Sequence, residues 1–550
     1  MLIIKQQKFF NKSSLTIFAI FLLALFLRLI NLSTIPYGFH IDEIVSGYVG
    51  RFILMHGQDP YGNHWPLVYF DMFGDYRVIL PMYINGLSTF IFGVNEFAVR
   101  FPTSFFGALI VFPIYSLSKI FFGKRKLSFL PPFLIAILPW HIVLSRATSE
   151  GILGLTVFLF GFDFLIKSLI NKKMSFLFVG NFLLFLTYFM YPTFRVLTPA
   201  LLLPFPILAK NFRKRFIVSL LIFIAFTGIV GLTVWGQGRF LQTSLFKNTD
   251  IANSIKGQDI ALNAAEGHNN AFVARIFNNK IIGYSQLFIS NYLTYFSPNF
   301  LFIKGGLPDR YVVPNDGLIF ITLLIPFLFL LFPQKLLLEK KYYYLILYLF
   351  LTAPAAAVLT IDDVPNVHRD LFMMIPLIFL ATIGLQKLII LTGKNKKILF
   401  CIVSILCISI IGEFIYFWHR YTVQAASYKS ILRDDGNKQM ILAIKKYPSE
   451  QVYIPVYEAL PVYYLFYNNN LSKELAGKFQ KGMMIDKINN VTFIQDWCPP
   501  NKLDKKTLPS NAIIVEAGDC KDNPSFTELQ VIYRKDSTKA FRILKYNGTN

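Results

Sequence analysis

The chain has 550 residues, of which 54% are hydrophobic and only 15% are charged. Soluble domains are about 45–50% apolar and about 25% charged, so the composition excludes a soluble globular protein and indicates a polytopic membrane protein. The net charge of +23 does not indicate nucleic-acid binding, because the basic residues cluster in short runs between apolar segments, as topology signals do. These runs are Lys124–Lys126, Lys172–Lys173, Arg213–Arg215, Lys340–Lys341 and Lys394–Lys397.

Eleven apolar segments are candidates for membrane-spanning helices, since a span needs about 20 mostly apolar residues. They cover residues 14–34, 97–122, 127–145, 151–170, 174–193, 196–210, 216–235, 317–336, 343–360, 370–391 and 397–418. The first follows Lys5, Lys8 and Lys12 and lacks a small-residue cleavage pattern, which predicts a retained anchor. The basic runs fall at every second junction, which predicts a cytoplasmic N-terminus and an extracytoplasmic C-terminus in the cell (inner or plasma) membrane.

Two of the predicted outer loops are long. In the first, about residues 35–96, Ile44–Met55 predicts a short amphipathic helix, and Val78–Phe92 is apolar but too short to span comfortably. The aromatic and polar stretch Tyr61–Pro66 lies between them. The other long loop, about residues 236–316, is rich in aromatic residues, which argues against disorder, and loops of this length are often functional.

After Trp418 the chain becomes more polar and has no further apolar run of span length. Short apolar runs predict buried strands at Val452–Val456, Val491–Gln495 and Ala512–Glu516, with helices at Asn437–Lys446 and Leu460–Tyr467. The predicted architecture is therefore a mostly α polytopic membrane domain of about eleven transmembrane helices (residues 1–418) followed by a small extracytoplasmic α/β domain (residues 419–550).

Asp42 and Glu43 come directly after the first predicted span. Two adjacent carboxylates can accept a proton or hold a cation, and acids this close to a span are functional candidates by default. The alternative is that both acids occupy the first turn of the next helix, where the helix dipole favours negative charge.

Further polar residues gather at the predicted outer ends of later spans. They are His141, Arg146, Glu150, Tyr191, Arg195, Lys304, Arg310, Tyr311, Asp362, Asp363, His368 and Arg369. The acidic residues come early in the chain and the cationic residues come late. This distribution suits a carboxylate base that acts on an acceptor hydroxyl and a group of cations that binds an anionic phosphate. Taken singly, Arg195 and Arg369 could instead anchor the chain at lipid headgroups, and His141 could belong to an aromatic belt.

The Asp-Glu pair after the first span, the long first outer loop, about eleven spans and an outer C-terminal domain resemble the GT-C glycosyltransferases. Residues 14–418 resemble more closely the bacterial membrane transferases related to protein O-mannosyltransferases and to the lipid A aminoarabinose transferase. The matching strings are Arg100–Pro102, Pro139–His141 with Ser145, Arg146 and Glu150, Tyr191–Arg195, Asn291–Ser297, Arg310–Tyr311, and Pro354 with Pro365 and Arg369. Tyr311 departs from the Arg-His pair expected there.

This resemblance implies a sugar donor linked to a polyprenyl phosphate, undecaprenyl phosphate in a bacterium, and transfer with inversion to an acceptor hydroxyl on the outer face. Asp42 would be the general base, and Glu43 would orient its neighbours or hold the acceptor; the two roles can also be exchanged. The cationic residues would stabilise the leaving phosphate. The expected partners are the donor, an acceptor protein, lipid or glycan, and membrane lipids. No metal ligands or cofactor are assigned, and a divalent metal is left open.

A transporter or flippase of lipid-linked saccharides is the alternative function, since it too would need charges and aromatic residues near the membrane. Such proteins usually contain repeated halves and broken helices near the midplane. The sequence contains no evident repeat, and its charges lie at span ends. A non-catalytic scaffold is a third possibility, but it leaves the placement of Asp42 and Glu43 unexplained.

Four cysteines are too few for a disulfide scaffold. Cys401 and Cys407 lie in the last predicted span and are expected to be free thiols. Cys498 and Cys520 lie in the predicted outer domain, where disulfides can persist, so they are expected to pair. The alternative is two buried free thiols.

Overall fold

The computed structural model describes residues 12–123, 125–209, 212–236, 244–246, 248–265, 271–333, 338–392, 395–428, 430–456 and 459–548. Lys5, Lys8, Lys124, Lys394 and residues 237–243, 247 and 266–270 of the second long loop lie outside them. The chain divides into two compact units. The first unit comprises Met1–Arg28, Phe105–Ser145 and Ser149–Phe417, and the second comprises Leu29–Ser104, Arg146–Thr148 and Trp418–Asn550.

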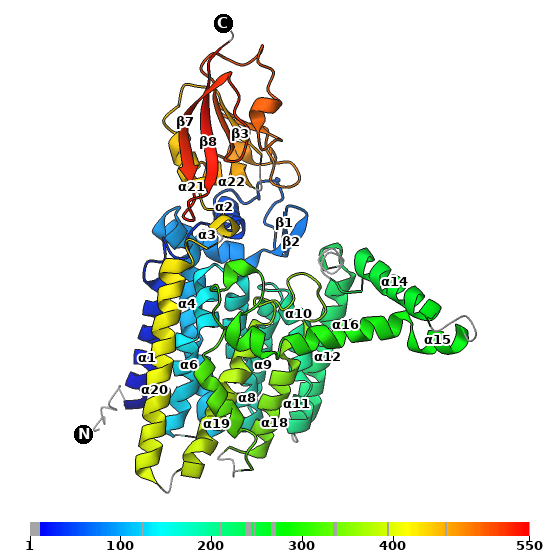
Figure 1. Cartoon of the computed structure of the whole chain (residues 1–550). Helices are drawn as coiled ribbons and strands as arrows, with labels where there is room; N and C mark the ends of the chain where they lie inside the picture. Colours follow the sequence, from blue (N-terminus) through cyan, green and yellow to red (C-terminus); the bar gives the residue numbers. More distant parts are fainter. Residues whose placement is uncertain are drawn as a thin grey trace. The chain divides into compact units, whose positions relative to one another are not determined.

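The first unit is built from helices (Figure 1). They are α1 (Lys12–Leu29), α5 (Val111–Phe122), α6 (Leu130–Ile137), α7 (Pro139–Arg146), α8 (Glu150–Asn171), α9 (Met174–Thr187), α10 (Thr193–Leu202), α11 (Phe205–Leu208), α12 (Arg213–Leu232), α14 (Thr249–Ala265), α15 (Ala271–Phe277), α16 (Lys280–Thr294), α17 (Leu324–Phe329), α18 (Lys340–Thr352), α19 (Met374–Thr392) and α20 (Lys396–His419). The helices α14 and α15 project beyond α16, away from the other helices of this unit (Figure 1).

Six helices in the described part of the chain are long and apolar enough to cross a membrane. The pair α6 and α7, bent by 49°, makes a seventh if it counts as one span. Within the described residues, each of the eleven predicted segments contains helical structure, but several helices are shorter than a span, so the count of eleven stays a prediction. Proline explains one of the breaks, because it cannot donate a backbone hydrogen bond: Pro204 separates α10 from α11.

Burial differs sharply among the apolar helices of the first unit. In α8, 78% of the most apolar window is buried, whereas in the span that contains α20 only 6% is buried. A helix that is apolar all round and buried belongs to a core, and one that is apolar and uncovered is compatible with lipid. The exposure of α20 therefore supports a membrane environment for this unit.

The second unit combines helices and two sheets. Its elements are α2 (Ile41–His56), β1 (Tyr69–Met72), β2 (Asp75–Val78), α3 (Leu80–Phe92), α4 (Glu96–Leu109, up to Ser104), α21 (Asn437–Ile444), β3 (Val452–Pro455), α22 (Leu460–Tyr467), β4 (Lys487–Ile488), β5 (Val491–Ile494), β6 (Ile513–Ala517), β7 (Phe526–Tyr533) and β8 (Lys539–Tyr546). The strands β1 and β2 form an antiparallel hairpin. The larger sheet has the order β4-β5-β3-β6-β8-β7, with β3 parallel to both of its neighbours.

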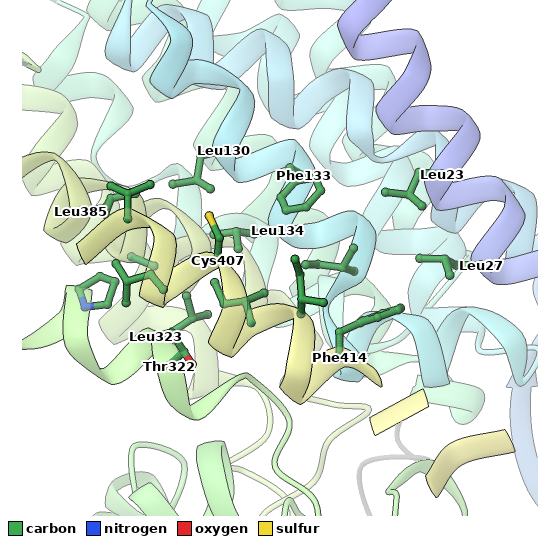
Figure 2. Close-up of a pocket in the computed structure, with 17 residues that line it drawn as sticks. Leu23, Leu27, Leu130, Phe133, Leu134, Thr322, Leu323, Leu385, Cys407 and Phe414 are labelled. Atoms are coloured by element: carbon green, nitrogen blue, oxygen red, sulfur yellow. The ribbon is translucent and has the colours of Figure 1, made fainter. Parts of the chain in front are cut away.

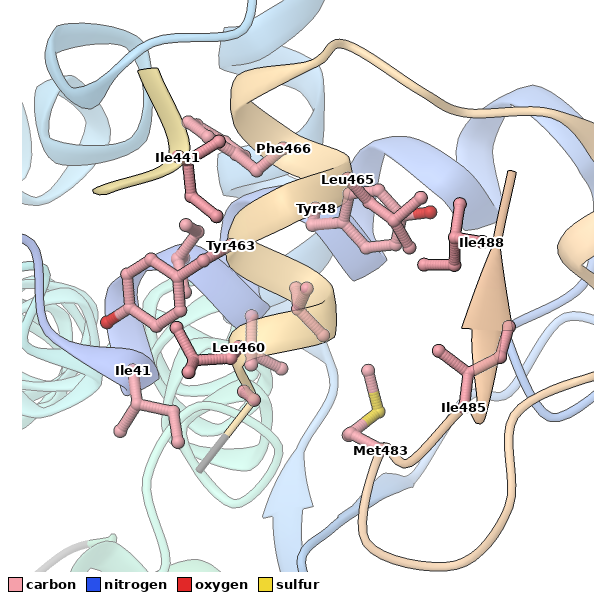
Figure 3. Close-up of a cluster of buried hydrophobic side chains, with 14 of the residues drawn as sticks. Ile41, Tyr48, Ile441, Leu460, Tyr463, Leu465, Phe466, Met483, Ile485 and Ile488 are labelled. Atoms are coloured by element: carbon pink, nitrogen blue, oxygen red, sulfur yellow. The ribbon is translucent and has the colours of Figure 1, made fainter. Parts of the chain in front are cut away.

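One hydrophobic core joins the first loop to the C-terminal residues of this unit (Figure 3). Ile41 and Tyr48 of α2 pack in the same cluster as Ile441 of α21 and Leu460 and Phe466 of α22. Burying a large apolar side chain stabilises a fold by about 1.5–3 kcal/mol, so this shared core binds the two segments strongly. The C-terminal residues therefore complete their core with helices from residues 29–104.

The helices α2 and α3 approach each other so closely that their backbones meet at Gly50 and Gly86. A Cβ atom added to Gly50 would collide with the carbonyl of Met82, and one added to Gly86 would collide with the backbone of Gly50. We therefore expect Gly50→Ala to lower the free energy of unfolding by about 1–3 kcal/mol, as overpacking does. Gly228→Ala is the matched control, because a Cβ on Gly228 meets no atom within 4 Å. Equal thermal stability of the two purified variants would contradict this expectation.

The structure joins Cys498 and Cys520 by a disulfide, with their Cα atoms 5.8 Å apart, whereas Cys401 and Cys407 are free thiols on α20. The bond closes a loop across 22 positions of the second unit. Replacing both bonded cysteines with serine is expected to cost about 2–4 kcal/mol, because the cross-link restricts the unfolded chain. Replacing Cys401 and Cys407 with serine is the control and should leave thermal unfolding unchanged. If both double variants have the same melting temperature as the wild type, the disulfide does not stabilise the fold.

Candidate active site

Asp42 and Glu43 lie in the first turn of α2. His40 caps this helix: its Nδ1 accepts a hydrogen bond from the backbone N–H of Asp42 (3.2 Å), and Glu43 Oε2 accepts one from the backbone N–H of His40 (3.2 Å). Asp434 Oδ2 accepts the N–H of Ile41 at 2.9 Å. Both acids thus lie where the helix dipole favours negative charge, but their environments differ.

Glu43 is buried among cations. Arg100 donates to both of its carboxylate oxygens, at 2.9 and 3.1 Å, Arg433 Nη2 donates at 2.9 Å and Thr148 Oγ1 at 3.0 Å. Burial alone would raise the pKa of Glu43, but the Coulomb attraction of Arg100 and Arg433 and the hydrogen bonds outweigh it and lower the pKa to about 2. Glu43 is therefore a weak proton acceptor that holds two buried arginines.

Asp42 is more accessible, with 20% of its side chain exposed. Its Oδ1 lies 3.3 Å from Arg77 Nη2, and its Oδ2 lies 3.6 Å from His40 Nδ1. Arg77 is itself held by Asp75 at 2.8 Å, so the guanidinium is fixed on β2 and orients the Asp42 carboxylate. Of the two acids, Asp42 has the geometry that better suits a general base.

Four predicted site residues lie together in the first unit. His368 Nε2 is 2.5 Å from Ser149 Oγ, and its Nδ1 is 3.3 Å from the hydroxyl of Tyr191. The ring of Tyr311 lies 5.3 Å from that of His368, and the Arg310 guanidinium lies 4.9 Å from the Tyr311 ring. We call Ser149, Tyr191, Arg310, Tyr311 and His368 the His368 cluster. Its donors and its cation can bind an anion.

The segment that carries His368 is held from two sides. Asn366 Oδ1 accepts the backbone N–H groups of His368 (2.9 Å) and Arg369 (2.8 Å), and Trp140 Nε1 donates to the carbonyl of Val367 (2.9 Å). The side chain of Arg369 has other partners within the described residues. It donates to Thr360 and to the carbonyl of Asp362, both at 2.8 Å.

His141 is fully buried and belongs to a polar network around Arg28. Arg28 Nη2 lies 2.7 Å from His141 Nδ1, and the guanidinium donates to the carbonyls of Ile135 (3.2 Å) and Ala136 (3.0 Å). The break between α6 and α7 leaves these carbonyls without helical partners, so Arg28 satisfies them inside an apolar bundle. His141 therefore has polar partners inside the helix bundle, which a residue of an aromatic belt at the membrane surface would not need.

The other predicted cations are held by backbone groups or exposed. Arg146 Nη2 donates to the carbonyls of Ile30 (2.7 Å) and Ile35 (3.0 Å). Arg195 Nε donates to the carbonyl of Tyr188 at 3.1 Å, with its guanidinium 4.6 Å from the Trp235 ring. Lys304 is exposed, and Glu150 lies in the first turn of α8.

Several residues that organise these clusters are absent from the predicted site. Arg28, Arg77, Ser149 and Arg433 have no predicted role, and Arg100 is predicted only as part of the matching string Arg100–Pro102. A buried acid such as Glu43 requires a cationic partner, but Arg433 lies 390 positions away and shows no local pattern. In the described ranges, no group of three or more His, Cys, Asp or Glu side chains is arranged to hold a metal ion.

An apolar groove of about 330 Å³ runs between helices of the first unit (Figure 2). Leu23 and Leu27 of α1, Phe133 of α6, Leu385 of α19 and Phe414 of α20 contribute to its walls. Thr322 also lines the groove, and its hydroxyl is bound to Glu413 Oε1 at 2.5 Å. The groove therefore presents hydrocarbon to any occupant.

No protein-family profile and no curated protein sequence matches the chain. Among solved structures, ArnT from Cupriavidus metallidurans bound to undecaprenyl phosphate matches with a TM-score of 0.52 and 12% identity, over 97% of this chain and 98% of that one. The apo oligosaccharyltransferase of Archaeoglobus fulgidus matches with a TM-score of 0.44 and 12% identity, over 84% of this chain and 64% of that one. The similarity to ArnT extends over nearly the whole length of both proteins, and the chain therefore shares the fold of that protein.

Proposed function

We propose that this protein is an integral-membrane glycosyltransferase that moves a sugar from a polyprenyl phosphate to an acceptor hydroxyl on the outer face of the membrane. The observation that carries the proposal is the contrast between Asp42 and Glu43 in the first turn of α2. Glu43 is engaged by Arg100 and Arg433, whereas Asp42 is partly exposed and oriented by Arg77. A GT-C fold with an oriented, accessible carboxylate directly after its first membrane helix suits base-assisted transfer from a lipid-linked donor.

In the proposed step, the acceptor oxygen attacks the anomeric carbon of the sugar while the bond from that carbon to the phosphate oxygen breaks. The acceptor proton passes to Asp42, and polyprenyl phosphate leaves as an anion. A single displacement of this kind inverts the anomeric centre. The His368 cluster is proposed to bind the leaving phosphate, because Arg310, His368 and Tyr191 supply a cation and hydrogen-bond donors.

The apolar groove of the first unit is proposed to hold part of the prenyl chain. Its walls are almost entirely aliphatic and aromatic, so an isoprenoid would replace lipid or water there without leaving polar groups unpaired. By the same proposal the protein lies in the cell membrane, with a cytoplasmic N-terminus and an extracytoplasmic C-terminus.

The test is to reconstitute the purified protein in liposomes with radiolabelled polyprenyl-phosphate sugars, supplied as separate donors with a crude cell-envelope acceptor. One donor is expected to be consumed, with release of polyprenyl phosphate, and the anomeric configuration of the product should be opposite to that of the donor. Movement of an intact labelled donor across the bilayer without consumption would instead identify a flippase. Retention of configuration would contradict the single displacement.

His368→Ala is expected to raise the KM for the donor and to lower kcat, together by about 10-fold to 100-fold in kcat/KM. The substitution removes the ring that joins Ser149 to Tyr191, so the hydrogen-bond donors proposed to bind the leaving phosphate lose their orientation. His419→Ala is the matched control, since His419 is exposed at the end of α20. Equal kinetics for the two variants would show that the His368 cluster does not act on the donor.

A further inference from the structure

A second concave surface lies in the second unit, on the hairpin β1–β2. It is a cleft of about 480 Å³ lined by the turn that contains Asp59, Tyr61 and Asn63, by Tyr69, Asp71 and Tyr76 of the hairpin, and by Lys481. The aromatic and polar stretch of the first loop thus forms one wall of a cavity.

The turn in this wall is fixed by a buried carboxylate. Asp59 is only 1% exposed, and its oxygens accept hydrogen bonds from the backbone N–H groups of Tyr61 and Asn63 and from the Asn63 side-chain amide, each at 2.9 Å. Tyr61 stacks on Phe70 with ring centroids 5.4 Å apart. The wall is therefore preformed, as ligand sites usually are.

The hairpin residues that line the cleft offer an aromatic surface. Tyr69 and Tyr76 meet edge to face, with ring centroids 4.9 Å apart, and Tyr69 remains 39% exposed. An aromatic face carries negative charge density that attracts the positively polarised C–H bonds of a pyranose ring. Rings held in this way lose little conformational freedom when a ligand binds.

Polar groups beside these rings can bind hydroxyls. Asp71 is half-buried, and its Oδ1 accepts a hydrogen bond from the backbone N–H of Gly74 at 2.8 Å, which helps to orient the carboxylate. A carboxylate is an acceptor only, and hydroxyl groups of a sugar are donors. Asn63 and Lys481 are exposed at the rim. Aromatic faces with oriented acceptors and amides suit a saccharide better than a hydrocarbon chain.

The same hairpin also orients the proposed base. Arg77 follows Tyr76 on β2, and its Nη2 lies 3.3 Å from Asp42 Oδ1. A ligand bound to Tyr69, Asp71 and Tyr76 therefore contacts the strand that positions Asp42. We infer that this cleft, which we call the hairpin cleft, is an acceptor subsite for the pyranose residues of a glycan. This inference rests on the proposed function and names the acceptor as a saccharide.

The test uses the full-length protein in nanodiscs and a panel of defined hexasaccharides (β-1,4-glucan, α-1,6-mannan and poly-N-acetyllactosamine) as probes. Saturation-transfer NMR measures binding, and the labelled donor measures transfer to glycan separately from hydrolysis by water. Tyr69→Ala is expected to weaken binding of the preferred hexasaccharide about 10-fold and to raise its KM by a similar factor, with donor hydrolysis unchanged. Asp71→Asn, which keeps the shape of the side chain, is expected to weaken binding in the same direction.

Tyr533→Ala is the matched control, because Tyr533 is an exposed tyrosine on β7 outside the cleft. Wild-type affinity in both cleft variants would overturn the inference, as would binding of unglycosylated peptides or lipids in place of every hexasaccharide. The two proposals fail separately. If no donor is consumed but hexasaccharides bind in a Tyr69-dependent manner, the transferase assignment fails and the saccharide site stands. If a donor is consumed and no glycan binds, the hairpin cleft is not an acceptor site.

Discussion

Asp42→Asn is expected to lower the rate of sugar transfer by about 10²–10⁴ while the protein still folds and inserts. The amide has nearly the shape of the carboxylate and can still accept from Arg77, but it cannot take up the acceptor proton at neutral pH. Asp42 is partly exposed on the first turn of α2, so the substitution leaves no buried charge behind. The loss is expected in kcat at saturating donor and acceptor.

The measurement is single-turnover transfer at saturating donor, with wild type and variant matched by folded amount. Asp519→Asn is a suitable control, because Asp519 is an exposed carboxylate of the second unit outside the proposed site. If Asp42 serves only the helix dipole, it contributes about 0.3–1 kcal/mol of stability, and Asp42→Asn would transfer sugar nearly as fast as wild type. That outcome would remove Asp42 from the proposed mechanism.

Glu43→Gln is expected to act on folding, with a loss of about 3–5 kcal/mol in the free energy of unfolding. The amide would leave Arg100, which is completely buried, and Arg433 without their shared anionic partner. Because Arg100 also binds the carbonyls of Leu32 and Pro36, the chain around α2 should loosen with it. Activity is expected to fall because the folded fraction falls.

The measurement is thermal or denaturant unfolding of the purified protein, with Glu474→Gln as control because Glu474 is exposed. The double variant Glu43→Gln with Arg100→Met should be less unstable than the sum of the single variants, since it removes one of the unpaired charges. The pKa of Glu43 is lowered to about 2, so its stabilisation is complete above its usual value of 4.5 and is lost as the pH falls toward 2. A Glu43→Gln protein with wild-type stability and no acid dependence of that kind would contradict the assigned role.

Local patterns predicted much of the architecture, because helices and short buried strands are encoded in consecutive residues. The predicted helix Leu460–Tyr467 has the bounds of α22, and the three predicted strands correspond to β3, β5 and β6. The hairpin β7–β8 was not predicted. Most of β7 is uncovered at the edge of the sheet, so its polar residues hide the alternation that marks a strand.

The partners of the charged residues were harder to predict than the elements. The sequence identifies Asp42 and Glu43 as a pair, but their different environments arise from Arg77, Arg100, Thr148 and Arg433, which come from separate segments. Likewise, the position of His141 near a predicted span end gives no sign that Arg28 lies against it. Such contacts depend on tertiary packing, which no short window of sequence contains.

The ion pair between Glu43 and Arg433 has a consequence for biosynthesis. The two residues are 390 positions apart, and at about 5–20 residues per second a ribosome needs roughly 20 to 80 seconds to make the intervening chain. During that time the amino end of α2 also lacks Asp434, and its apolar side lacks α22. Until residue 433 is made, the first loop therefore lacks part of its core and one of the two arginines that bind Glu43. Premature termination before Arg433 leaves the first loop in that state permanently.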